Sequence, residues 1–312
     1  RDRSVSRGLG DVYKRQVKHM IRIIASDMDG TLLNNKHDID EETVEAIRKA
    51  EEAGIIFAIS TGREYDSVKG ILEKHNIKAQ CVLSNGAEYR DEEGNILDVI
   101  NINEEAAKKI IKMLNENKLS ARIFTDKGVF TTSTKEEALQ EVVFRTMTFN
   151  PGTTEEEARK IAETQGFFTC LKYIDNIEKF FSEGIEVRKF VAFHKDIELI
   201  DKMKMLISEI PGLAISSSFR DNIEVTDINA QKGIILEKVA KKMSIDSKEV
   251  MIFGDSFNDY SMFEIFEESV AMKNAIPEVK AIAKYITDSN DNLGVAKAIY
   301  NVLNDEMDKM LK

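Results

Sequence analysis

The stretch Ile21–Thr31 reads IRIIASDMDGT and decides the fold. Its first part, IRIIAS, is a short apolar run of the kind that forms a strand buried on both faces of a sheet. The acidic loop Asp27–Thr31 follows at once, and the next residues predict a helix from Asp40 to Ala53 and a second apolar strand at Ile55–Ser60 (IIFAIS). Buried strands that alternate with helices indicate a parallel α/β sheet.

This alternation breaks near Asn85 and resumes after Lys232, where VMIF at Val250–Phe253 gives another buried strand. Between these points the sequence predicts helices mixed with antiparallel hairpins, such as Glu88–Ile100. We therefore predict an α/β fold in which residues 20–87 and 218–312 form the core and residues 88–217 form an inserted α+β domain.

The segment before Met20 is polar and aperiodic, and we expect residues 1–19 to be a non-native N-terminal segment. Residues 11–16 read DVYKRQ and can be back-translated into a sequence that resembles a transposase adapter used to prepare sequencing libraries. This interpretation puts the natural start at Met20. The alternative is a disordered native tail.

Composition and charge narrow the function classes. The chain has 312 residues, 44 Lys and Arg against 55 Asp and Glu, and a net charge of −11, which argues against a nucleic-acid partner. No apolar run approaches the roughly 18 residues that would span a membrane. Cys81 and Cys170 lack metal-ligand spacing, and we predict two buried thiols in a reducing compartment. We expect a cytoplasmic protein that is a monomer or a small homo-oligomer.

The loop after the first strand carries the strongest chemical signal. Asp27 and Asp29 lie two residues apart at the carboxyl end of a parallel strand, where α/β sheets place their sites. This spacing suits a nucleophile, Asp27, that forms an aspartyl-phosphate, and a general acid and base, Asp29. Gly30 permits the turn, and Thr31 is placed to orient the acid. The alternative is an ordinary Asp-rich turn.

Two further signals point to a bound phosphoryl group. Thr61 and Gly62 end the second strand, where a hydroxyl and backbone N–H groups can bind phosphoryl oxygens, and Arg63 can pair with a carboxylate or anchor the next helix. Lys232 begins a helix after the insert and can neutralise both a phosphoryl group and nearby carboxylates. An N-capped turn and an ordinary surface lysine are the alternatives.

The fourth signal is GDSFND at residues 254–259, directly after a buried strand. Hard oxygen ligands suit Mg²⁺, and we expect Asp255, Asp27 and the backbone carbonyl of Asp29 to bind it. Asp259 is predicted to hold Lys232 or a metal-bound water, and Asn258 to reach substrate. Without a cation, carboxylates clustered in this way repel one another and are costly to bury.

Six phrases carry a resemblance to a known family: MIRIIASDMDGTLLN, ISTGR, LSNGAEY, QKGIIL, GDSFNDYSMF and SVAMKNA. With them the chain resembles the haloacid dehalogenase (HAD) superfamily, and within it the Cof-type phosphatases with a type IIB cap, over essentially all residues from Met20. The resemblance implies a Rossmann-like core, an inserted cap that sets substrate specificity, and Mg²⁺. It gives the residues named above the same roles and adds Asn85, which faces the cap and helps to bind substrate.

The leading hypothesis is a Mg²⁺-dependent phosphatase of small phosphorylated metabolites, such as sugar phosphates or phosphorylated cofactors. A sugar phosphomutase is the nearest alternative, although it usually needs several cap arginines. Between Arg90 and Val187 the insert offers only Arg122, Arg145 and Arg159, with Arg188 just beyond that range. A non-catalytic regulator that binds a phosphometabolite is the other. Such a protein should have lost Asp29 or Lys232, and both are present.

Overall fold

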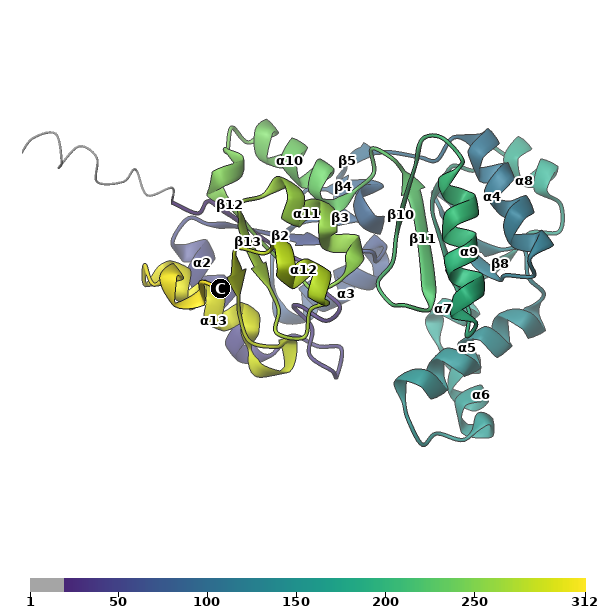
Figure 1. Ribbon diagram of the computed structural model, residues 1–312, viewed down its shortest axis with the longest axis horizontal. Helices are drawn as coiled ribbons and strands as arrows, with labels where there is room; N and C mark the ends of the chain where they lie inside the picture. Colours follow the sequence, from purple (N-terminus) through teal and green to yellow (C-terminus); the bar gives the residue numbers. More distant parts are fainter. Residues whose placement is uncertain (1–19) are drawn as a thin grey trace, which may run out of the picture.

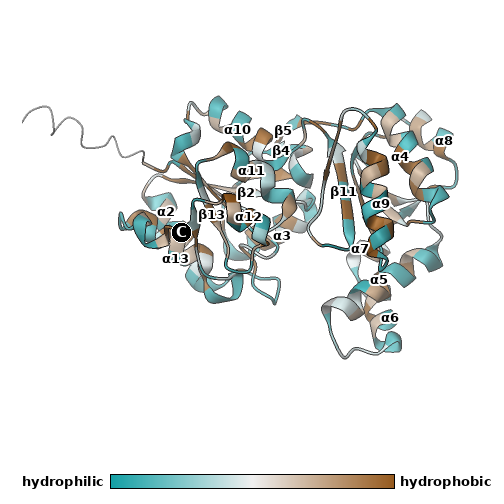
Figure 2. Cartoon of the chain, viewed as in Figure 1, coloured by the Kyte–Doolittle hydropathy of each residue, from teal (hydrophilic) through white to brown (hydrophobic). Residues whose placement is uncertain are grey.

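The computed structural model describes residues 20–312, which form two sheets with their helices side by side (Figure 1). The predicted non-native segment, residues 1–19, lies outside the described residues. In Figure 2 the central strands of the larger sheet are hydrophobic, whereas α6 (Glu155–Thr164) and α10 (Lys232–Lys242) are largely hydrophilic on their outer sides.

The larger sheet has eight strands, and its central part is parallel as predicted. Only the pairs at one edge, β3 with β4 and β4 with β5, are antiparallel. Every residue of β1, β3 and β12 is buried, as the continuous apolar runs require. In sheet order the strands are β14 (Tyr285–Ile286), β13 (Glu268–Ala271), β12 (Val250–Gly254), β1 (Ile23–Ser26), β2 (Ile56–Ser60), β3 (Gln80–Leu83), β4 (Glu88–Arg90) and β5 (Ile96–Val99).

Helices of this core pack in groups: α2 against α13, and α10 against α11. Helix α2 begins after Asp40, as predicted, but the Asp40 side chain accepts a hydrogen bond from Asn34 rather than capping the helix. The core helices are α2 (Glu41–Glu52), α3 (Tyr65–His75), α10, α11 (Tyr260–Ile265), α12 (Pro277–Ile282) and α13 (Gly294–Leu303).

The smaller sheet has six strands and is antiparallel except where β7 meets β8. Its apolar face packs on α4 and α9, and α5 to α7 extend from one end (Figure 1). In sheet order the strands are β10 (Leu213–Ser216), β11 (Asn222–Asp227), β9 (Val187–Phe193), β6 (Ala121–Thr125), β7 (Gly128–Thr131) and β8 (Lys172–Tyr173). The helices are α4 (Glu104–Glu116), α5 (Lys135–Phe149), α6, α7 (Gly166–Thr169), α8 (Ile177–Ser182) and α9 (Ile197–Ser208).

The α/β core with an inserted α+β unit is therefore confirmed, but the chain passes between the sheets at other points than residues 88 and 217. Strands β4 and β5 belong to the larger sheet, because β3 offers them an open edge, and β11 belongs to the smaller sheet. The first crossing lies at Asn101, between Ile100 N–H, which donates to Ala87, and Ile102 N–H, which donates to Val187. The second lies between β11 and α10.

The prediction that both cysteines are buried holds for one of them only. Cys81 is buried, and burial raises the pKa of its thiol to about 12, whereas Cys170 is exposed, contrary to the prediction, because it ends the short helix α7 at the surface. Within residues 20–312, none of the helices is long and apolar enough to cross a membrane.

Candidate active site

Three loops of the predicted site leave the same edge of the larger sheet. Ser26 of β1 lies opposite Ile59 of β2 and Phe253 of β12, so that the residues following these parallel strands emerge together. Asp27 and Asp255 are consequently neighbours, and Asp27 N–H donates to the carbonyl of Phe253 at 3.0 Å. The parallel register thus brings together carboxylates that are far apart in the sequence.

Gly30 allows the loop after β1 to approach Asp255 closely. Its φ of +77° lies in the left-handed region that favours glycine. A Cβ at this position would lie 2.6 Å from Oδ2 of Asp255, so that any side chain would displace that carboxylate.

Lys232, at the first position of α10, is fully buried between two carboxylates. Its Nζ donates to Oδ1 of Asp27 at 2.7 Å and to Oδ1 of Asp259 at 2.6 Å. Burial alone would lower the pKa of Lys232, but the two carboxylates outweigh it and raise that pKa above its ordinary value. The ammonium group is therefore a fixed positive charge beside the candidate nucleophile.

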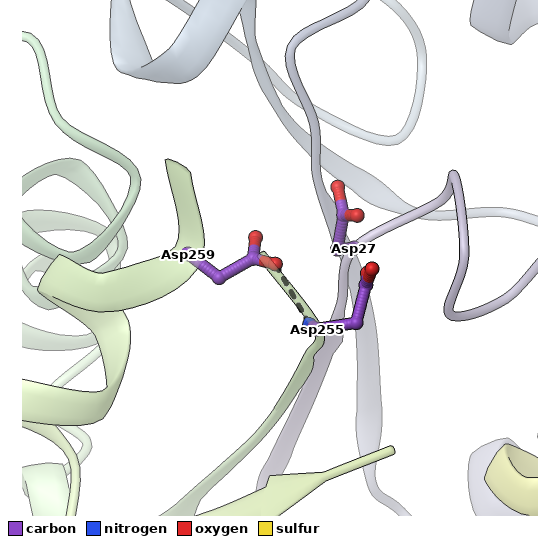
Figure 3. A group of neighbouring side chains, drawn as sticks. All are labelled: Asp27, Asp255 and Asp259. Atoms are coloured by element: carbon purple, nitrogen blue, oxygen red, sulfur yellow. Dashed lines mark hydrogen bonds between the residues drawn. The ribbon is translucent and has the colours of Figure 1, made fainter. Parts of the chain in front are cut away.

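Asp259 has both carboxylate oxygens engaged. While Oδ1 accepts from Lys232, Oδ2 accepts from the backbone N–H groups of Asp255 and Ser256 at 2.9 and 3.1 Å. Figure 3 shows the bond to Asp255, with the Asp27 and Asp255 side chains projecting in the same direction. Asp259 thus fixes the loop after β12 and the lysine at once, which fits the supporting role predicted for it.

The three carboxylates Asp27, Asp255 and Asp259 offer oxygen atoms that all lie within 4.8 Å of one another. Burial, followed by repulsion from Asp259, raises the pKa of Asp255 to about 7. The same two causes raise the pKa of Asp27 well above its ordinary value, against the opposing effect of Lys232. Carboxylate oxygens are hard donors, which Mg²⁺ prefers, and a bound cation offsets the cost of ionising these buried groups. The donor set therefore fits the predicted ion.

Asp29 lies beside this cluster and is held by Arg63, which donates from Nε at 2.8 Å and from a terminal nitrogen at 2.6 Å. Two roles were considered for Arg63, and the structure shows the first of them, pairing with a carboxylate. Thr31, which the sequence placed as a partner of the acid Asp29, instead donates to Oδ1 of Asp255 at 2.8 Å. The turn at Gly30 directs the hydroxyl toward β12.

Thr61 and Gly62 lie at the end of β2 as predicted. Thr61 is buried, and its Oγ1 accepts a hydrogen bond from Arg63 N–H at 3.3 Å, which leaves the hydroxyl able to donate its own proton. Gly62 meets the smaller sheet, because its carbonyl accepts from Nζ of Lys189 at 3.1 Å. The phosphate-binding role of both residues stays a prediction.

Asn85 and Asn258 both contact residues of the smaller domain. Asn85 Nδ2 donates to Oε2 of Glu224 at 2.6 Å, and Asn258 Nδ2 donates to Oγ of Ser218 at 3.1 Å. Both asparagines line a cavity of about 370 Å³ between the domains, together with residues of β10, α9, α10 and α11. The structure thus places both predicted substrate contacts where the two domains meet.

Glu224 and Lys189 are residues of this interface, and the sequence analysis left Glu224 out altogether. They form an ion pair of 2.5 Å on adjoining strands, with 3% of each residue exposed. Burial alone would raise the pKa of Glu224, but the Lys189 charge and the hydrogen bonds from Lys189, Ser218 and Asn85 lower it to about 2. A signal existed: in NIEVTD, Ile223 and Val225 alternate with polar residues that the structure also buries.

Comparison with known proteins agrees with this geometry. Residues 24–299 match the model of a family described as haloacid dehalogenase-like hydrolase. Phosphatase YwpJ of Bacillus subtilis (strain 168) is 32% identical over 285 residues, which cover 91% of this chain and 100% of that protein. The 5-amino-6-(5-phospho-D-ribitylamino)uracil phosphatase YwtE of the same organism is 32% identical over 283 residues, or 91% of this chain and 98% of that protein.

A solved structure, that of a haloacid dehalogenase-like hydrolase from B. subtilis, has a TM-score of 0.80 at 32% identity and covers 90% of this chain and 99% of its own. The predicted resemblance, and with it the prediction of an enzyme that is a hydrolase of this type, is confirmed. Because the family model and the two relatives span the core and the insert together, the chain belongs to the haloacid dehalogenase-like hydrolase family.

Proposed function

We propose that the chain is a Mg²⁺-dependent phosphatase that hydrolyses phosphate monoesters of small metabolites through an aspartyl-phosphate on Asp27. The observation that carries the proposal is the fully buried Lys232, whose Nζ bridges Asp27 and Asp259 at 2.7 and 2.6 Å. A buried lysine between two carboxylates fixes the position of Asp27 Oδ1 and leaves Oδ2 as the attacking oxygen.

In the first step, Oδ2 of Asp27 attacks phosphorus, and the bond from phosphorus to the ester oxygen breaks. Asp29, in its protonated form, gives its proton to the departing oxygen. In the second step, the Asp29 carboxylate takes a proton from water, which attacks phosphorus and breaks the bond to Asp27. Inorganic phosphate leaves, and both aspartates return to their starting forms.

Asp27, Asp255 and the backbone carbonyl of Asp29 are the residues that would hold Mg²⁺. When bound, the ion neutralises the phosphoryl oxygens and the clustered carboxylates. Lys232 contributes the second local positive charge. These two cations explain how a chain with a net charge of −11 can bind an anionic ester.

The test is a Mg²⁺-dependent screen over phosphorylated metabolites and p-nitrophenyl phosphate, with the Asp27→Asn protein as the blank. The panel includes the phosphorylated compound in the name of YwtE. We expect turnover that requires Mg²⁺ and falls by at least about 10³-fold in Asp27→Asn. A folded Asp27→Asn protein with undiminished turnover would refute the proposal.

The phosphomutase alternative finds little support in the arginines of the smaller domain. Arg122 and Arg145 both lie within 4 Å of Glu141, and Arg159 pairs with the exposed Glu136 of α5. Arginines already paired with glutamates in this way are poorly placed to rebind a second phosphate. A turnover that depends on added glucose 1,6-bisphosphate would favour the mutase.

A further inference from the structure

Two buried amide oxygens at the domain interface lack hydrogen-bond partners. They are Oδ1 of Asn85 and Oδ1 of Asn258, and within residues 20–312 neither accepts a hydrogen bond. The two residues are 3% and 8% exposed, and both line the cavity between the domains. Because an unpaired buried acceptor is unfavourable, each oxygen marks a place where a ligand that donates a hydrogen bond would be stabilised.

Glu224 determines which end of each amide is left without a partner. Its Oε2 accepts from Asn85 Nδ2 at 2.6 Å, and its Oε1 accepts from Ser218 Oγ at 2.5 Å. Since Ser218 gives its only proton to Glu224, its oxygen can only accept from Asn258, whose Nδ2 donates to it at 3.1 Å. An ionised carboxylate cannot donate, so both amides are held with their NH₂ groups toward Glu224.

The Asn85 oxygen lies close to the predicted phosphate-binding loop. A Cβ added to Gly62 would lie 2.9 Å from Oδ1 of Asn85. An acceptor oxygen at this place repels phosphoryl oxygens, but it can accept from a hydroxyl or amino group carried near the ester oxygen. This chemistry refines the substrate contact that the sequence predicted for Asn85 and Asn258.

We propose that Glu224 is a positioning residue that turns Asn85 and Asn258 into paired acceptors, so that the enzyme selects phosphate esters whose leaving group carries hydroxyl or amino donors. The proposal rests on the proposed phosphatase function. Lys189 supports it by keeping Glu224 ionised, through the ion pair of 2.5 Å. An alkyl phosphate without such donors leaves both oxygens buried and unpaired, and is selected against for that reason.

The test compares erythritol 4-phosphate with n-butyl phosphate, which have the same carbon chain and differ in hydroxyl groups. With saturating Mg²⁺, we expect kcat/KM to favour the polyol ester by at least about tenfold, as one lost hydrogen bond implies. In Glu224→Gln this preference should fall toward one, because a glutamine can also donate and no longer fixes the amides. The change should come from slower turnover of the polyol ester, with n-butyl phosphate nearly unaffected.

Ser218→Ala removes the acceptor of Asn258 alone, so this variant should lose only part of the preference for the polyol ester. Glu183→Gln, on an exposed glutamate that pairs with Lys179 at the end of α8, is the matched control and should keep all of it. If Glu224→Gln does not fold, the double variant Lys189→Met/Glu224→Gln is used in its place, because it leaves no unpaired buried charge. The same loss of preference is expected for it.

An equal kcat/KM for the two esters in the wild-type protein would overturn the inference, and so would a preference that survives in Glu224→Gln. In both cases hydrolysis of p-nitrophenyl phosphate would show that the proposed function stands. If the wild-type protein hydrolyses none of the three esters and no compound of the Mg²⁺-dependent screen, the proposed function itself fails, and this inference fails with it.

Discussion

Arg63 binds both carboxylate oxygens of Asp29, from Nε to Oδ2 at 2.8 Å and from a terminal nitrogen to Oδ1 at 2.6 Å. The pairing orients this carboxylate, which suits the base of the second step. For the first step it must gain a proton and turn toward the leaving oxygen. Arg63 thus positions the group that is proposed to move the proton in both steps.

Replacing Arg63 should therefore impair proton transfer more than binding. For Arg63→Met we expect kcat/KM to fall about 100-fold with n-butyl phosphate, and less than about tenfold with p-nitrophenyl phosphate, whose leaving group needs no proton. Steady-state kinetics with both esters measure this difference. Arg48→Met, on the exposed surface of α2, is the control. Equal losses with both substrates would show that Arg63 does not act through Asp29.

Mg²⁺ should stabilise the folded protein. Burial and repulsion from Asp259 raise the pKa values of Asp27 and Asp255, so that an added cation removes an unfavourable interaction. At about 100 times its Kd, Mg²⁺ should add about 2.7 kcal/mol to the free energy of unfolding, and EDTA should reverse the gain. Urea titrations at matched ionic strength measure it. The same gain in Asp255→Asn would count against this site.

Lys232→Met should be strongly destabilising, because it leaves Asp27 and Asp259 buried together without a cation. Breaking such a buried pair typically costs about 3–5 kcal/mol in the free energy of unfolding. Lys241→Met is the matched control on the same helix: its ion pair with Glu237 is largely exposed and should contribute less than about 1 kcal/mol. A loss for Lys232→Met no larger than the control's would contradict the buried bridge.

The Lys189–Glu224 ion pair should make the free energy of unfolding depend on pH in the acid range. The pKa of Glu224 is lowered from an ordinary 4.5 to about 2 in the folded state, so the unfolded state binds a proton at higher pH. Its stabilising contribution is complete above pH 4.5 and is lost as the pH falls toward 2. The stability difference between wild type and Lys189→Met/Glu224→Gln should shrink over this range. A pH-independent difference in urea titrations would rule out this linkage.

Gly62→Ala should weaken substrate binding. The new methyl group would lie 2.9 Å from Oδ1 of Asn85 and 3.0 Å from Nζ of Lys189, so that these side chains at the domain interface would have to shift. We expect KM to rise several-fold, with little change in the melting temperature. Gly70→Ala, in α3 with open space around it, should leave KM unchanged and stabilise the helix by about 0.5–1 kcal/mol. Unchanged KM in Gly62→Ala would show that the contact is not needed.

The sequence alone predicted the core and the residues of its loops, for a physical reason. A parallel strand buried on both faces must be continuously apolar, and IRIIAS and VMIF are such runs. Since parallel strands place their carboxyl ends together, Asp27 and Asp255 could be predicted as neighbours from their positions after two strands. The bridge from Lys232 to both Asp27 and Asp259 agrees with the roles inferred for those residues.

What escaped prediction lies mainly in the smaller domain, where the pairing of distant strands decides the arrangement. Strand β11 reads like a hairpin arm of either domain, and only its pairing with β9 assigns it to the smaller sheet. Lys189 and Glu224 have no local signal of their partnership, because it arises from that same pairing. Helix α5 was overlooked although the Thr134–Glu137 capping box marks its beginning.

The return crossing of the chain has a consequence for motion. Only residues 228–231 separate β11 of the smaller sheet from Lys232, and a Cβ on Gly86 would lie 2.8 Å from the backbone of Gln231. Any swing of the smaller domain must bend the chain at this short hinge or at Asn101. This short connection packs against the loop that carries Asn85, and it ends at Lys232, which donates a hydrogen bond to Asp27. Any opening of the cleft would therefore move the backbone next to Lys232, and with it the hydrogen bond that positions the proposed nucleophile Asp27.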